Sequence, residues 1–78
     1  MPAVQRILRL TAERRRRGWS QRELGRRAGV GYADIARIER GMPPYQSHAE
    51  RLATALGLRV EELTDLIRVP AAKREVKA

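Results

Sequence analysis

The stretch from Ser20 to Gly41 limits what this chain can fold into more than any other part of it. It contains two short helical patterns, over residues 21–28 and 32–40, on either side of a glycine-containing turn. A serine followed three residues later by a glutamate, as at Ser20 and Glu23, is a capping box that starts a helix. Glycine directly after a helical pattern marks its end, because glycine readily takes the left-handed conformation. The stretch therefore predicts two short helices joined by a tight turn.

Each of these two helical patterns has an apolar side and a polar side. Leu24 lies on the inner side of the first pattern. Ile35 and Ile38 form the inner side of the second pattern at helical spacing. The outer sides carry polar, small and aromatic residues, namely Arg22, Arg26, Arg27, Tyr32, Ala33, Ala36 and Arg37. Two helices joined in this way form a helix-turn-helix unit, whose second helix can enter the major groove of DNA.

The rest of the sequence predicts three further helices and no strand. An apolar stripe predicts the first helix over residues 3–17. Residues 47–50 form a second capping box, and the helix that follows it is expected to end at Leu56. The last helix is expected over about residues 60–68. The expected fold class is therefore all-α, a compact bundle of five helices with the helix-turn-helix at the second and third.

The chain is short enough for one domain, which we expect over residues 3–69. Residues 70–78 are small and charged, and they are expected to form a short, basic, disordered tail.

Positive charge is concentrated in the half of the chain that contains the two-helix unit. The net charge is +8, from 17 Lys and Arg against 9 Asp and Glu. Residues 1–41 hold 11 basic and 4 acidic residues, whereas residues 42–78 hold 6 and 5. Such a distribution indicates an anionic partner, nucleic acid before a membrane surface.

The composition argues against several other classes of function. With no cysteine and one histidine, the chain has no disulfide framework, no thiolate metal site and no nucleophile–base arrangement. We therefore expect neither an enzyme nor a metal, cofactor or small-molecule site. The sequence has no apolar run of membrane-spanning length and no signal-peptide core behind its N-terminus, so a cytoplasmic location without membrane contact is expected.

Taken together, these residues resemble the lambda-repressor-like, Cro/C1-type (Xre) family of DNA-binding domains over about residues 4–67. The matching residues occur in the order and spacing of the family: Arg14, Gly18-Trp19-Ser20-Gln21, Glu23-Leu24, Ala28-Gly29-Val30, Ile35, Arg37-Ile38-Glu39-Arg40-Gly41, Leu52-Ala53, Ala55-Leu56-Gly57 and Glu62-Leu63. The family fold is a compact bundle of five helices whose third helix reads DNA. The resemblance implies a bacterial or phage regulator that binds double-stranded DNA.

The resemblance places base contacts at Tyr32, Ala33 and Arg37. Arg37 has the reach for a bidentate contact with guanine, and otherwise it is a solvated surface arginine. Tyr32 either contacts a sugar or a thymine methyl group, or it covers the turn. Asp34, where the family usually has a small polar residue, either caps the helix or accepts a hydrogen bond from cytosine.

Contacts with DNA phosphates are expected at Gln21, Arg40, Arg17, Arg22, Ser47 and His48. Gln21 is also expected to buttress the third helix. Ser47 and His48 belong to the segment over residues 43–48, which contains a loop and the start of the fourth predicted helix. The run of arginines that contains Arg17 is otherwise a solvated helix face.

Two further pairs of residues have structural roles under this resemblance. Arg14 and Glu39 match a partly buried ion pair that ties the first helix to the third. Leu66 and Val69 lie off the inner stripe of the last predicted helix. They are either ordinary exposed residues or the contacts of a homodimer, because family members commonly pair near this end.

Two function hypotheses follow from the sequence. The first is a small, phage-type (Cro-like or immunity) repressor that occupies a pseudo-palindromic operator as a dimer. The alternative is the antitoxin of a toxin–antitoxin pair, in which the 70–78 tail binds a toxin protein.

Overall fold

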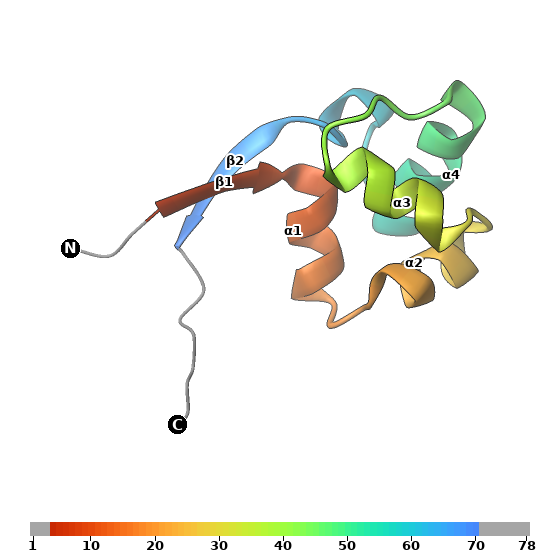
Figure 1. The fold of residues 1–78 in the computed structure, drawn as a ribbon, viewed down its shortest axis with the longest axis horizontal. Helices are drawn as coiled ribbons and strands as arrows, with labels where there is room; N and C mark the ends of the chain where they lie inside the picture. The colour runs from red at the N-terminus through yellow and green to blue at the C-terminus, as the bar shows by residue number, and fades with distance from the viewer. Residues whose placement is uncertain (1–3, 71–78) are drawn as a thin grey trace.

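A computed structural model describes residues 4–70 of the chain, and Figure 1 shows their arrangement. Four α-helices form the body of the molecule, and a pair of antiparallel strands extends from it. In chain order the elements are β1 (Val4–Leu8), α1 (Arg9–Arg16), α2 (Gln21–Ala28), α3 (Tyr32–Glu39), α4 (Gln46–Leu56), a short 3-10 helix η1 (Val60–Glu62) and β2 (Leu66–Pro70). The helix-turn-helix prediction is confirmed, whereas the five-helix count is wrong.

The core lies where the four helices meet, and it contains almost only aliphatic side chains. Its buried residues are Leu10, Leu24, Val30, Ile35, Ile38, Ala49, Leu52, Ala53, Leu56 and Leu63. Each fully buried leucine or isoleucine contributes about 1.5–3 kcal/mol relative to an exposed one. The inner sides predicted for residues 21–28, for residues 32–40 and for the helix that ends at Leu56 all face this core.

The predicted helix over residues 3–17 is wrong in its first half, because residues 4–8 form strand β1. The strand is paired with β2, and helix α1 starts only at Arg9. The first amides of α1 also have partners from the other end of the chain: Arg9 N donates to the carbonyl of Asp65 at 2.8 Å, and Leu10 N donates to that of Leu63 at 3.0 Å. These long-range bonds fix the start of the helix.

The helix predicted over residues 60–68 is also wrong. Only residues 60–62 are helical, and the backbone amide of Arg59 donates to Oε1 of Glu62 at 2.7 Å at the start of this turn. Leu63 then fills the core, and the chain turns into strand β2 at Leu66. Pro70, which the sequence places in the tail, is the last residue of β2, and residues 71–78 lie outside the described residues.

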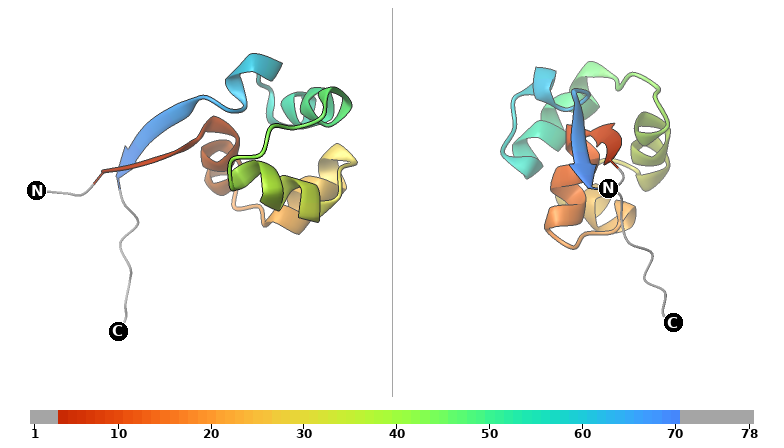
Figure 2. Two further views of the ribbon diagram at one scale, coloured as in Figure 1. Left: turned by 45° about the horizontal axis from the view of Figure 1, so that its top comes forward. Right: turned by 90° about the vertical axis from the view of Figure 1, so that its left-hand side faces the viewer.

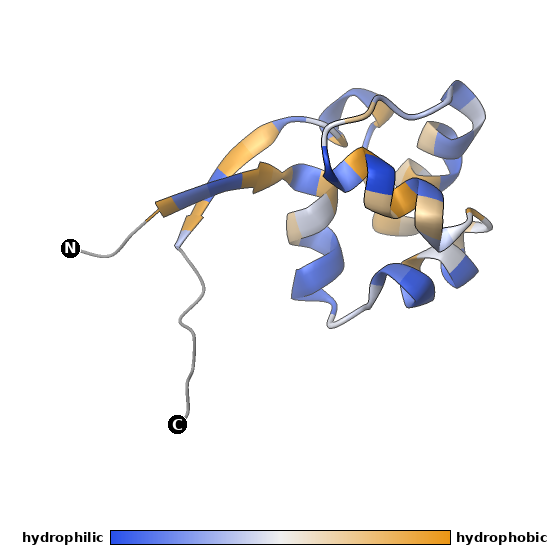
Figure 3. Cartoon of the chain, viewed as in Figure 1, coloured by the Kyte–Doolittle hydropathy of each residue, from blue (hydrophilic) through white to orange (hydrophobic). Residues whose placement is uncertain are grey.

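The two strands form a ribbon that projects away from the helices, as Figures 1 and 2 show from three directions. Leu8 is paired with Leu66 at its base, Ile7 with Ile67 further out, and Val4 with Pro70 at its end. Figure 3 shows hydrophobic colour at both ends of β1, with a hydrophilic stretch between them, and over most of β2. Val4 and Leu66 are nevertheless 59% and 62% exposed. An isolated two-stranded ribbon is marginally stable in water, so this part of the molecule is held less firmly than the helical body.

Within residues 4–70, no helix has the length and apolar character needed to cross a membrane.

Candidate nucleic-acid interface

Helices α2 and α3 are held at a fixed angle by their caps and by the turn between them. Oγ of Ser20 accepts a hydrogen bond from the amide of Glu23 at 3.0 Å and starts α2. Gly29 ends α2 in the left-handed conformation, with φ at +74°, and Val30 is buried in the turn. A Cβ on Gly25 would collide with the carbonyl oxygen of Val30, so the turn requires a glycine inside α2.

The capping box at Ser20 is formed only in half. The serine hydroxyl caps the helix as predicted, but the carboxylate of Glu23 accepts from Arg26 and Arg27, at 2.6 Å each. Arginines three and four residues later on the helix lie within reach of this carboxylate. Arg26, the stronger influence, and Arg27 lower the pKa of Glu23 through these hydrogen bonds.

The outer face of α3 is open to solvent. Tyr32, Ala33, Arg37 and Arg40 are exposed, whereas Ile35 and Ile38 are buried beneath them. The face therefore presents an aromatic ring, a methyl group and two guanidinium groups on a helix that is anchored from below.

The carboxylate of Asp34 lies near Arg37 and His48 rather than at the helix cap. Its Oδ1 is 3.5 Å from NH1 of Arg37, and its Oδ2 is 3.8 Å from Nδ1 of His48. The N-terminus of α3 has no side-chain cap hydrogen bond. The capping interpretation of Asp34 is therefore wrong, and this carboxylate instead faces Arg37 on α3 and His48 in the first turn of α4.

Arg22 and Tyr32 form a contact between the exposed faces of α2 and α3. The guanidinium carbon of Arg22 lies 4.0 Å from the centroid of the Tyr32 ring. A cation over an aromatic face at this distance is attracted by the ring quadrupole. Their separation in the sequence carries no local signal, so sequence reasoning did not find this contact.

A polar network beneath α3 joins three elements. Arg14 binds Glu39 through two hydrogen bonds, Nε to Oε2 at 2.8 Å and NH2 to Oε1 at 3.0 Å. The side chains of this ion pair are 11% and 10% exposed. Gln21 donates its Nε2 to the same Glu39 Oε1 at 3.0 Å. The start of α2 and the end of α3 are thus tied to α1, and Gln21 buttresses α3 from the first turn of α2.

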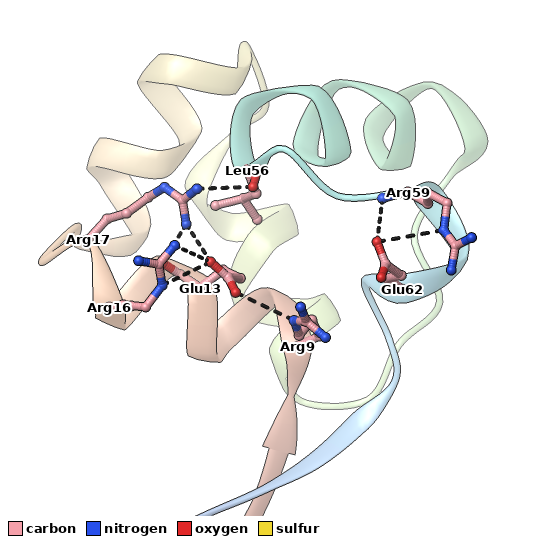
Figure 4. Close-up of polar contacts among 7 residues, drawn as sticks. All are labelled: Arg9, Glu13, Arg16, Arg17, Leu56, Arg59 and Glu62. Atoms are coloured by element: carbon pink, nitrogen blue, oxygen red, sulfur yellow. Dashed lines mark hydrogen bonds and ion pairs between the residues drawn. The ribbon is translucent and has the colours of Figure 1, made fainter.

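Arg17, which was expected to contact a phosphate, is engaged inside the protein. Figure 4 shows it with Arg9 and Arg16 around Glu13. Its NH1 donates to Glu13 Oε1 at 2.7 Å, and its NH2 donates to the carbonyl of Leu56 at the end of α4 at 3.0 Å. The hydrogen bonds from Arg17 and then Arg16 lower the pKa of Glu13. We therefore assign Arg17 a structural role that joins α1 to α4.

The start of α4 lies beside α3, at the predicted second group of phosphate contacts. Tyr45 occupies the N-cap, so Ser47 lies inside the first turn, and the capping box predicted there is wrong. Gln46 Nε2 donates to Oε2 of Glu50 at 3.0 Å. The first amides of any helix have no partner inside it, and they attract anions. The backbone around Ser47 and His48 is therefore suited to a phosphate, although no side chain caps it.

Within residues 4–70, no group of three or more His, Cys, Asp or Glu side chains is arranged so that it could bind a metal ion.

Comparisons with known proteins agree with this geometry. The family described as helix-turn-helix matches residues 10–63. A similar solved structure is the N-terminal DNA-binding domain of the master biofilm regulator SinR from Bacillus subtilis, with a TM-score of 0.67 and 30% identity, covering 73% of this chain and 86% of that one. No curated protein sequence matches the chain. With the match spanning most of its length, the chain belongs to the Cro/C1-type helix-turn-helix family.

Proposed function

We propose that this protein is a sequence-specific DNA-binding transcriptional regulator that acts as a small repressor by occupying its operator. The exposed face of α3 carries this proposal, because a guanidinium, an aromatic ring and a methyl group project from a helix anchored by the core. An α-helix fits the major groove of B-DNA, where each base pair presents a distinct pattern of donors and acceptors. The similarity to the DNA-binding domain of SinR supports the same function.

The proposed base contacts are those of the α3 face. Arg37 pairs with a guanine edge, while Tyr32 and Ala33 contact sugar or thymine methyl groups. Asp34 lies close enough to Arg37 to restrain its guanidinium, and it also offers an acceptor to cytosine.

The proposed phosphate contacts surround this face. Gln21 and Arg22 serve one side of the groove from α2, and Arg40 serves the end of α3. Ser47 and His48 serve the other side through the start of α4. Such contacts fix the register of a protein on DNA, and the base contacts provide the specificity.

The direct test is selection of binding sites from random duplexes, followed by titration at several salt concentrations. Wild-type protein should enrich one sequence, and Arg37→Ala should change the preferred base at one position, with a loss of about 1–3 kcal/mol of discrimination. Arg16→Ala is the matched control, because this arginine is exposed on α1 and pairs only with Glu13. Equal affinity of the wild type for every duplex would contradict the proposal, and a larger change of preference in the control would exclude α3 as the reading helix.

We further propose that the protein binds its operator as a homodimer through the β1–β2 ribbon. Leu66 and Val4 lie on the same face of the ribbon as Arg6 and Arg68, whereas Ile67 and the half-buried Val69 lie on the opposite face. Packing the Val69 faces of two ribbons together would cover these two side chains and leave the arginine face open. On a pseudo-palindromic operator the two α3 helices would then need to lie about 34–36 Å apart. Sedimentation of the wild type and of Val69→Ser on a palindromic duplex tests this, since the variant should bind with lost cooperativity. Equal cooperativity of the two proteins would show that the ribbon does not form the dimer interface.

The antitoxin alternative depends on residues 70–78, of which only Pro70 is described.

A further inference from the structure

Most arginines in the described chain have an internal partner. Carboxylates pair with the side chains of Arg9, Arg14, Arg16, Arg17, Arg26, Arg27, Arg37 and Arg59. Arg22 lies over the ring of Tyr32, and Arg51 donates to the carbonyl of Gly29. Four arginines have no carboxylate, aromatic ring or backbone carbonyl as a side-chain partner within residues 4–70. They are Arg6, Arg15, Arg40 and Arg68.

These four arginines lie close together, although they come from four elements or element ends. Arg6, Arg15 and Arg40 line one hollow of about 290 Å³ at the base of the ribbon. Arg68 is the direct partner of Arg6 in the β1–β2 register, so the two side chains lie on the same face of the ribbon. All four are exposed.

Among the described residues, Glu39 is the only carboxylate that lines this hollow, and its charge is already neutralised. Glu39 is bound by Arg14 at 2.8 Å and also accepts from Gln21. It therefore cannot balance the positive charge of the hollow as well. Like charges directly opposite each other in a sheet are destabilising, so the pair of Arg6 and Arg68 weakens a ribbon that is already marginal. A surface of this kind is suited to an anionic partner.

The position of the hollow identifies that partner. Arg40 follows the last residue of α3, so the hollow begins where the proposed reading helix ends. Figures 1 and 2 both show the C-terminal end of α3 beside the start of α1, where the ribbon joins the body. A duplex that lies against the outer face of α3 continues toward this point. Guanidinium groups bind phosphate oxygens in bidentate geometry.

We propose that the hollow and the adjoining face of the ribbon, formed by Arg6, Arg15, Arg40 and Arg68, bind the phosphodiester backbone of the same DNA duplex that α3 reads. This inference rests on the proposed function, and it extends the contact surface beyond the helix-turn-helix to the ribbon. The site contributes affinity and salt dependence, but not base preference.

The salt dependence of binding tests the proposal. The full chain and its Arg6→Gln/Arg15→Gln variant are titrated with a selected duplex at several salt concentrations. Each phosphate contact contributes about 0.9 to the slope of log K against log salt. The slope of the double variant should fall by about 1–2 per protomer, with the preferred sequence unchanged.

The matched control is Arg16→Gln/Arg59→Gln, which removes the same charge from side chains that are 67% and 72% exposed and lie outside the hollow. Its slope should stay close to that of the wild type. Equal slopes in the two double variants would overturn the proposal while leaving sequence-specific binding intact. Absence of any sequence preference in the wild type would instead overturn the proposed function.

Ethylation interference provides a measurement that does not depend on folding of the variants. Ethylated phosphates beyond the segment read by α3 should weaken binding of the wild type. Interference confined to phosphates beside the major-groove contact would overturn the proposal.

Discussion

The helix-turn-helix unit and the β1–β2 ribbon contain similar aliphatic residues, but they are determined in different ways. In the unit, α2 begins and ends at the predicted residues, because Ser20 caps one end and Gly29 terminates the other. In the ribbon, Val4, Ile7 and Leu8 follow helical spacing, yet they pair as a strand with residues 66–70. A cap acts within one turn of chain, whereas a strand needs a partner that is distant in sequence. Local signals therefore predicted the first region well and the second region wrongly.

The largest effect is expected in the network beneath α3. Glu39→Ala would leave the guanidinium of Arg14 nearly buried without its carboxylate, and it would remove the acceptor of Gln21. Losing one partner of a buried pair costs about 3–5 kcal/mol of stability. Urea unfolding followed by circular dichroism measures this cost. A loss below about 1 kcal/mol, the value typical of surface pairs, would mean that the network does not hold the reading helix.

The boundary between the core and the ribbon is tested by two leucines that are three residues apart. Leu63 is 1% exposed and fills the core, whereas Leu66 is 62% exposed on the ribbon. Leu63→Ala should cost about 2–5 kcal/mol because it leaves a cavity. Leu66→Ala should change the stability of the monomer by about 0.5 kcal/mol or less, as at other exposed positions. Thermal unfolding at a concentration where the protein is monomeric distinguishes the two, and similar losses would place the ribbon within the folding core.

A smaller effect is expected at the turn of the unit. Gly25→Ala would improve helix propensity, but the new Cβ would collide with the backbone carbonyl of Val30. Such overpacking costs about 1–3 kcal/mol. Gly29→Ala is the control, because nothing lies within 4 Å of its Cβ position and only its φ of +74° is strained. A gain of stability in Gly25→Ala, measured by urea unfolding, would show that the turn relaxes and is not rigid.

The smallest effect is the pH dependence that arises from Glu13. Its pKa is lowered in the folded protein by hydrogen bonds from Arg17 and Arg16. The stabilisation is therefore fully present above the unfolded-state pKa of glutamate, about 4.3, and it is lost as the pH falls through the lower folded-state pKa. In a series of melting temperatures measured at decreasing pH, Glu13→Gln should reduce the fall in melting temperature on the acid side, the acid limb of the curve. An identical acid limb in the variant would show that other carboxylates account for it.

The scaffold of the site was predictable from the sequence, but several side-chain roles were not. Arg14 and Glu39 pair as the resemblance implied, because this contact belongs to the shared fold. Arg17 sits in a run of four arginines, and nothing in that run distinguishes the one that reaches the carbonyl of Leu56. Asp34 fits a helix cap by spacing alone. Arg37 approaches it from three residues later on the same helix, whereas His48 comes close to it only in the tertiary structure.

The sequence by itself determined the helix-turn-helix, since capping residues, glycines and apolar spacing act over a few residues and agree with one another. It also determined the excess of positive charge in the first half of the chain. The tertiary structure alone decided that residues 4–8 and 66–70 are strands. The spacing of apolar residues in a short aliphatic segment fits both a helix and a strand, so pairing with a partner strand decides between them. The tertiary structure also decided which arginines have internal partners. The long side chain of arginine can reach several acceptors, and the fold determines which of them lie within hydrogen-bond distance.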